Sequence, residues 1–184
     1  IIGLMFGSFA SAIVSVLSYF STAEELKKYT IWTMGNIGGL SWEHVMILLL
    51  TITTGTIIGF TQIKPLNALM LGENYALSMG INLNKSKYLL LISTSILTGC
   101  VTAFVGPIAF VGLAVPHATR LIFKTSHHKT LFIGTALFGG ITLLFCDTIS
   151  QIPGTSIILP INAITSIIGA PVVIGLILRK SRLL

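Results

Sequence analysis

The sequence predicts an all-α polytopic membrane protein with about six transmembrane helices. Hydrophobic residues make up 53% of the chain and charged residues only 9%, whereas soluble domains carry roughly 25% charged residues. The few charged residues lie between long uncharged runs. A bilayer core needs about 20 apolar residues per helix, so each uncharged run predicts one or more spans.

The first two uncharged runs, Ile1–Phe20 and Val45–Ile63, are each long enough to cross a membrane once. The next run, Tyr88–Thr119, is too long for one ordinary span. Glycine followed by proline favours a turn, so Gly106-Pro107 is predicted to divide this run into two spans, the second being Gly106–Arg120. A five-span alternative fuses Tyr88–Thr119 into one kinked and tilted helix.

The last two spans are predicted at Thr130–Cys146 and Ile161–Leu178. The uncharged stretch between them is interrupted at Pro153-Gly154 and again at Pro160. Proline removes a backbone donor and breaks a helix interior, so the sixth span is expected to begin after Pro160.

The positions of lysine and arginine distinguish six spans from five. With six spans, nine of the eleven cations fall on one side of the membrane, and only Lys27 and Lys28 fall on the other. Cytoplasmic loops are enriched in lysine and arginine, so the nine-cation side is predicted to be cytoplasmic, with both ends of this chain there. The nine cations are Lys64, Lys85, Lys87, Arg120, Lys124, Lys129, Arg179, Lys180 and Arg182.

The net charge of +6 is explained by this orientation, so we discard a nucleic-acid partner. Three of the five acidic residues fall in the predicted outer loop Ser21–His44, which also holds Trp32 and Trp42. Tryptophan concentrates at membrane interfaces, which accounts for both residues. The length of the loop leaves room for a re-entrant segment or a surface that docks an external protein.

The longest predicted cytoplasmic connection is Lys64–Lys87, KPLNALMLGENYALSMGINLNKSK, which is too polar to span a membrane. Leucine and methionine are interleaved with asparagine, glutamate and serine, a pattern typical of one or two short surface helices, and Gly72 and Gly80 are the expected turns. The segment is either a partner surface or an amphipathic connector that rests on the protein's own helices or on lipid headgroups.

Few residues in the spans are candidates for chemistry. Asp147 lies in a largely apolar stretch, but at the outer end of the fifth span, where a solvated helix end or a bond to nearby backbone is favoured over proton relay. His117, His127 and His128 lie at the cytoplasmic edge, and their spacing matches no metal signature. The two cysteines lie inside apolar spans, where a thiol acts as a small hydrophobe. We therefore predict no metal site.

Two pairs of glycines, Gly3/Gly7 and Gly55/Gly59, have the small-xxx-small spacing that allows helices to approach closely. We interpret both pairs as helix-packing sites.

Three blocks of the sequence resemble FecCD-type permeases, the membrane subunits of ATP-binding-cassette importers for iron–siderophores, haem and vitamin B12. They are LGENYALSMGI at Leu71–Ile81, GPIAFVGLAVPHATRL at Gly106–Leu121 and LPINAITSIIGAPVVIGLILRK at Leu159–Lys180. The resemblance covers essentially the whole chain. It implies a permease fold of ten helices, in which residues 1–184 form the C-terminal part of a single transmembrane domain and the first four helices precede Ile1.

The resemblance also implies roles for individual residues. Residues 64–87 would form a cytoplasmic coupling segment of two short helices that docks on the ATP-binding subunit, and its motif is matched by Leu71, Gly72, Glu73, Ala76 and Gly80. The family's scaffold signature is matched by Gly106, Pro107, Gly112, Pro116, His117, Arg120, Pro160, Gly169 and Pro171. The first span would line the translocation path, with a polar stripe at Ser8, Ser11 and Ser15.

The function implied by the resemblance is that of a permease subunit of an importer in the bacterial inner membrane, with an iron–siderophore or a related metal chelate as substrate. This chain would catalyse no reaction and bind no cofactor, because ATP would bind to a separate cytoplasmic subunit. Consistent with this, the sequence has no GxxxxGK[ST] phosphate-binding loop. The other expected partners are a second permease subunit, in a homodimer or heterodimer, an extracytoplasmic substrate-binding protein and the lipid bilayer.

One position departs from the family pattern. Leu159 precedes Pro160, where the family usually has an acidic residue, so docking of the binding protein through an ion pair at this loop is not expected. Lys27, Lys28 or residues before Ile1 are the alternative docking sites.

Two other classes of protein stay open from the sequence. A secondary transporter or channel would use the broken helix at residues 106–116 to bind an ion through backbone carbonyls and helix ends. A membrane-embedded metalloenzyme would use His117, His127 and His128, although neither their spacing nor an acidic partner supports it.

Overall fold

A computed structural model describes residues 2–151 and 159–181, and within these residues the regular structure is helical. The long helices follow the predicted spans, and three shorter helices lie between them. The helices are α1 (Ile2–Phe20), α2 (Ala23–Thr33), α3 (Trp42–Thr61), α4 (Ile63–Leu69), α5 (Glu73–Ser78), α6 (Leu83–Val105), α7 (Val111–Phe123), α8 (His128–Ser150) and α9 (Ile161–Ser181).

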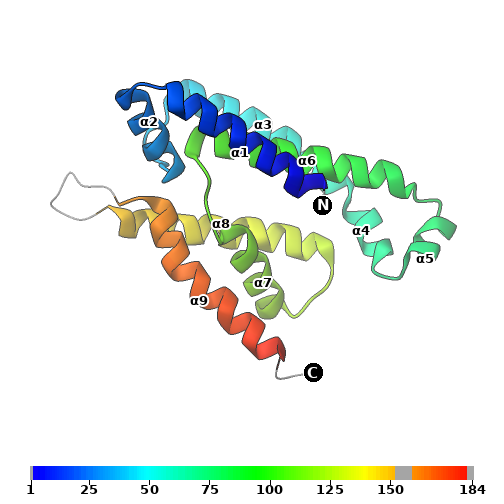
Figure 1. Cartoon of the computed structure of the whole chain (residues 1–184). Helices are drawn as coiled ribbons and strands as arrows, with labels where there is room; N and C mark the ends of the chain where they lie inside the picture. Colours follow the sequence, from blue (N-terminus) through cyan, green and yellow to red (C-terminus); the bar gives the residue numbers. More distant parts are fainter. Residues whose placement is uncertain (1, 152–158, 182–184) are drawn as a thin grey trace.

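The long helices form two groups (Figure 1). In the first group α3 packs against α6, and in the second α7 packs against both α8 and α9. The short helices α4 and α5 lie together at one end of these groups, and α2 lies at the other end. The beginning of α1 and the end of α9 are on the same side as α4 and α5, as expected for an even number of crossings (Figure 1).

Four of the described helices, α1, α3, α6 and α8, are long and apolar enough to cross a membrane. The fourth predicted span corresponds to the shorter apolar helix α7, and the sixth corresponds to α9. The five-span alternative is wrong, because α6 ends at Val105 and residues 106–110 separate it from α7. Gly106 has a φ of +86°, which favours glycine, so the predicted turn at Gly106-Pro107 is confirmed.

Glycines allow α3 and α6 to pack closely. A Cβ on Gly55 would lie 2.8 Å from Leu97 Cγ, and a Cβ on Gly59 would lie 2.9 Å from Ser93 Oγ. The Ser93 hydroxyl donates a hydrogen bond to the Gly55 carbonyl at 2.8 Å. Gly55/Gly59 is therefore a helix-packing pair, as predicted, whereas a Cβ on Gly3 or Gly7 would meet no atom within 4 Å in the part of the chain that the structure describes.

Helix α2 is a feature that the sequence analysis did not predict. Thr22 and Glu25 form a capping box at its start: the Thr22 N–H donates to Glu25 Oε2 at 2.9 Å, and the Glu25 N–H donates to Thr22 Oγ1 at 3.4 Å. A capping box satisfies two helix donors that would otherwise lack partners. The hydrogen bond from the Thr22 backbone holds the pKa of the Glu25 carboxyl below its ordinary value. The outer loop therefore contains a short exposed helix.

The loop after α2 is bonded to the end of α6. The Trp32 Nε1–H donates to the Ala103 carbonyl at 3.0 Å, and the Asn36 N–H donates to the Val105 carbonyl at 2.9 Å. A Cβ on Gly106 would collide with the Trp32 carbonyl oxygen, so only glycine fits there. The signature residue Gly106 thus joins the outer loop to the break between α6 and α7.

Candidate functional site

The helix pair α4–α5 occupies the segment that the sequence predicts to be a coupling element. Its entrance is fixed at Gln62, which is buried and accepts a hydrogen bond from the Ser86 hydroxyl of α6 at 2.9 Å. Ile63 and Ala68 are buried on the inner side of α4. The pair is therefore anchored to the helices from which it projects.

Two glycines set the course of the chain around α5. Gly72 has a φ of +111° and precedes the first turn of α5, which begins at Glu73. Gly80 has a φ of +77° and follows α5; its N–H donates to Leu77, and the Ile81 N–H donates to Ala76, which is the hydrogen-bond pattern of a Schellman motif. Both predicted turns are confirmed.

Helix α5 and the residues that flank it expose apolar side chains beside the polar residues Glu73, Asn74 and Ser78. Ala76 is fully buried, so one side of this short helix packs inward. Leu71 is 67% exposed and Tyr75 is 50% exposed. The further exposed apolar residues of this segment are Met70, Leu77 and Met79. Helix α4 thus rests on the protein's own helices, whereas α5 is exposed except at Ala76.

A polar junction connects α4 to the start of α8. Asn67 Oδ1 accepts hydrogen bonds from the His128 backbone N–H at 3.0 Å and from the His128 ring Nδ1 at 2.9 Å. The His127 Nε2 lies 3.5 Å from Asn67 Nδ2. Sequence reasoning placed both histidines at the cytoplasmic edge without a partner, and it assigned Asn67 no role.

Beside this junction lies a cavity of about 430 Å³. The signature residues Pro116 and Arg120 of α7 line it together with His128, and most of the rest of its wall is apolar. The other lining residues are Thr56, Leu66, Leu97, Leu131, Phe132, Thr135 and Ala136. His117 is exposed on the same short helix and is not among the lining residues.

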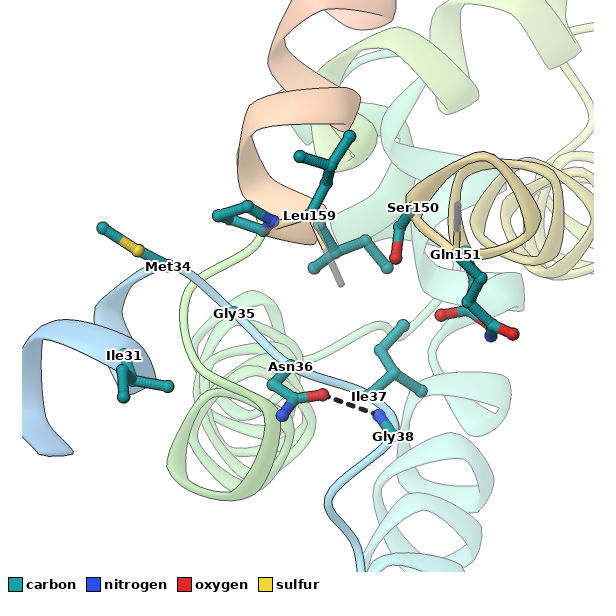
Figure 2. A pocket seen from close by; sticks show the side chains of 12 residues that line it. Ile31, Met34, Gly35, Asn36, Ile37, Gly38, Ser150, Gln151 and Leu159 are labelled. Carbon is teal, nitrogen blue, oxygen red and sulfur yellow. Dashed lines mark hydrogen bonds between the residues drawn. The ribbon is translucent and has the colours of Figure 1, made fainter. Parts of the chain in front are cut away.

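A second cavity, of about 300 Å³, lies at the opposite end of the molecule, where the loop after α2 meets the end of α8 and the start of α9 (Figure 2). Its polar lining includes Asn36, whose Oδ1 accepts a hydrogen bond from the Gly38 N–H at 2.8 Å. Asp147 also lines it and accepts a hydrogen bond from the Gln151 side chain at 2.9 Å. Asp147 therefore has a neighbouring side chain at the helix end as its partner.

The second and third signature blocks meet at residues 109–110. The Ala109 N–H donates to Asn162 Oδ1 at 3.1 Å, and a Cβ on Gly169 would lie 2.5 Å from Phe110 Cβ. Pro160 lines the second cavity just before α9. Gly112 of α7 and Pro171 of α9 are exposed, and a Cβ on Gly112 would meet no described atom within 4 Å. Some signature residues, such as Gly169, are therefore in close contact with neighbouring segments, whereas others, such as Gly112 and Pro171, are exposed.

The serine stripe of α1 is exposed in the chain, as is nearly all of this helix. The Ser15 hydroxyl donates to the Ser11 carbonyl at 3.0 Å, and Ser8 lies one turn before Ser11. The structure thus leaves the three serines on an uncovered helix.

Among the described residues, no group of three or more histidine, cysteine, aspartate or glutamate side chains could hold a metal ion. His117 is not brought to the Asn67 junction, so the histidines do not form one cluster. The absence of a metal site stays a prediction.

The long apolar helices and the helix pair α4–α5 at one end define a multi-pass α-helical membrane protein. The sequence matches the FecCD transport family over residues 1–179, and the chain belongs to that family.

Two curated relatives are permeases of import systems. The vitamin B12 import system permease protein BtuC of Salmonella typhi is 37% identical over 180 residues, which are 98% of this chain and 55% of BtuC. The hemin transport system permease protein HmuU of Yersinia pestis is 34% identical over 178 residues, covering 97% of this chain and 53% of HmuU. The chain thus spans about half the length of these relatives.

A solved structure has the same arrangement of helices. It is described as an inward-facing conformation of a transporter assigned to the metal-chelate type of ABC transporters, and it superposes with a TM-score of 0.87 at 29% identity. The match covers 97% of this chain and 57% of that one. The fold and the family therefore agree.

Proposed function

We propose that the chain is part of the membrane-spanning permease subunit of an ATP-binding-cassette importer for an iron–siderophore or a related metal chelate. The observation that supports this most is the α4–α5 pair, which is anchored at Gln62 and Ala76 and exposes apolar side chains at one end of the helix groups. The relatives are named for vitamin B12, hemin and metal chelates. Each is a complex of a metal with an organic ligand, which supports this substrate class.

In this proposal the exposed side chains of Leu71 and Tyr75 contact a separate cytoplasmic ATP-binding subunit. Glu73 and the turn residues Gly72 and Gly80 give the helix pair its shape. When the ATP-binding subunits close, the anchored pair moves as a rigid body and tilts the spanning helices. The chain itself makes and breaks no bonds, so we propose that it is not an enzyme.

Two further partners complete the proposed importer. A second permease subunit, identical or not, forms the translocation path with this one, and the exposed serine stripe at Ser8, Ser11 and Ser15 is the proposed lining. An extracytoplasmic binding protein delivers the substrate at the opposite end from α4–α5. The complex lies in the bacterial inner membrane, where residues 64–87 and both ends of this chain are cytoplasmic and residues 1–184 belong to one permease domain.

The alternative of an ion site at the broken helix has less support. Two of the carbonyls that flank the break are bonded within the protein: the Val105 carbonyl accepts from the Asn36 N–H, and the Phe110 carbonyl accepts from the Ala114 N–H. Carbonyls that are engaged in this way are less available to an ion. We therefore retain the importer as the proposal.

The test is transport by the complete permease subunit in proteoliposomes, with and without its ATP-binding subunit. Vitamin B12, hemin and a ferric siderophore are offered in turn through their binding proteins. We expect transport only with the ATP-binding subunit, and we expect Gly72→Trp and Glu73→Arg to uncouple it from ATP hydrolysis. The control is Thr94→Val, because Thr94 is exposed midway along α6, away from both ends of the molecule. Transport that persists without the ATP-binding subunit contradicts the proposal.

A further inference from the structure

Polar contacts attach the coupling helix α4 to both helix groups. At the entrance of α4, Gln62 bonds to Ser86 of α6. In the following turn, Asn67 bonds to the backbone and to the ring of His128 at the start of α8. Because α4 spans only Ile63–Leu69, the two attachments lie on opposite ends of one short rigid element.

The attachment to α8 is made to its main chain. The first N–H groups of a helix have no partners within the helix, so a side-chain oxygen that accepts from one of them is bonded to the helix itself. Asn67 Oδ1 does this at a separation of 61 residues in sequence. Leu66, the neighbour of Asn67, lines the first cavity with Leu131 and Phe132 of α8, and α4 packs beside α8.

Helix α8 is in turn packed tightly against α7. A Cβ on Gly134 of α8 would lie 2.8 Å from Thr119 Cγ2 and 3.0 Å from Phe123 Cε2, so the two helices are in close contact at this position. Close-packed interiors transmit displacement because they cannot be compressed. A movement of the first turn of α8 would therefore be passed to α7.

We propose that Asn67 is a positioning residue that transmits movement of the coupling segment to α8 and, through it, to α7. This inference rests on the proposed function and adds a residue outside the motif Leu71–Ile81. The contact between Gln62 and Ser86 carries the same movement to α6 and its partner α3. Asn67 acts through the position of α8, and it needs no contact with the substrate or with ATP.

The test compares variants of the complete permease subunit, reconstituted with its ATP-binding subunit and binding protein in proteoliposomes. Asn67→Leu and Asn67→Ala remove the acceptor, whereas Asn67→Asp keeps an oxygen at the same place. Thr130→Val is the matched control, because Thr130 is exposed in the first turn of α8. The measured quantities are moles of substrate transported per mole of ATP hydrolysed, copurification of the ATP-binding subunit, and thermal stability. The substrate is whichever of vitamin B12, hemin or a ferric siderophore the wild type transports.

We expect Asn67→Leu and Asn67→Ala to lower the transport ratio by about tenfold, within the usual range of coupling between sites, while the ATP-binding subunit still copurifies. Asn67→Asp and Thr130→Val should keep the ratio within about twofold of the wild type. An unchanged ratio in both acceptor-free variants overturns the inference. So does loss of assembly or stability in both, since this shows a structural role only. A wild type without ATP-dependent transport refutes the proposed function itself.

Discussion

Gly169 of α9 lies directly against Phe110, the residue that precedes α7, so that a Cβ on Gly169 would come within 2.5 Å of Phe110 Cβ. Phe110 has a φ of +64°, an uncommon conformation for a residue with a side chain. The hydrogen bond from the Ala109 backbone N–H to Asn162 Oδ1 lies beside this contact. The break between α6 and α7 is therefore held in place by α9.

Replacing Gly169 should loosen this contact. Gly169→Leu introduces a side chain where there is no space, and overpacking of this kind costs about 1–3 kcal/mol. We expect a lower melting temperature for the detergent-solubilised subunit. Gly175→Leu on the same helix is the control, because a Cβ there would meet none of the described atoms within 4 Å. Equal melting temperatures for the two variants would contradict the packing described.

The buried side chains of Gln62 and Ser86 should contribute jointly to stability, because they share a hydrogen bond. Gln62→Leu leaves the Ser86 hydroxyl without its acceptor, and an unsatisfied buried polar group costs about 1–3 kcal/mol. Ser86→Ala should cost less, and the double variant should be more stable than the sum of the single losses predicts. Thermal unfolding of the four proteins measures this cycle. Additive losses would show that the two side chains do not interact.

The left-handed conformation of Gly80 should make this position sensitive to any side chain except asparagine. There is free space around a Cβ at Gly80, so the cost of Gly80→Val is conformational, about 1–2 kcal/mol. Gly80→Asn should be tolerated, because asparagine adopts this conformation more readily. Hydrogen exchange of the α5 amides reports the difference. If the α5 amides exchange as slowly in Gly80→Val as in the wild type, the Schellman motif does not stabilise this helix.

Acid should weaken the start of α2. The pKa of Glu25 is lowered in the folded protein, so its carboxylate stabilises α2 above the unfolded pKa, and this contribution is lost as pH falls through the folded pKa. The loss begins below the ordinary glutamate pKa of about 4.3. Trp32 fluorescence in a Trp42→Phe background reports it, because Trp32 stacks on Tyr29 of the same helix. Glu25→Gln should remove this transition; a transition that persists unchanged has another source.

The positions of the long helices could be predicted because lipid requires long uncharged runs. Their ends could not be predicted in the same way. Helix α6 begins at Leu83 and not at the predicted Tyr88, because Asn82 caps it and Lys85 and Lys87 are accommodated in its first turns. The charged residues show where the apolar run begins, whereas the capping residue Asn82 determines where the helix begins.

The candidate site was only partly visible in the sequence. The turns at Gly72 and Gly80 were predicted, because a glycine signals a turn through its own backbone conformation and needs no distant partner. The junction of Asn67 with His128 was not, because its partners are 61 residues apart and nothing in a single sequence pairs them. Helix α2 was also missed, although the pattern Thr22-x-x-Glu25 is a local signal for a capping box.

The central proposal is that the α4–α5 pair seats on an ATP-binding subunit, and disulfide cross-linking measures this most directly. Cys100 and Cys146 are first replaced by alanine, and Leu71→Cys is introduced into the complete subunit, opposite cysteines placed on the ATP-binding subunit. Leu26→Cys on α2, at the other end of the molecule, is the control. We predict a cross-link from position 71 whose yield changes when ATP is added, and none from position 26. Efficient assembly with no cross-link from position 71, or an equal yield from position 26, would contradict the proposal.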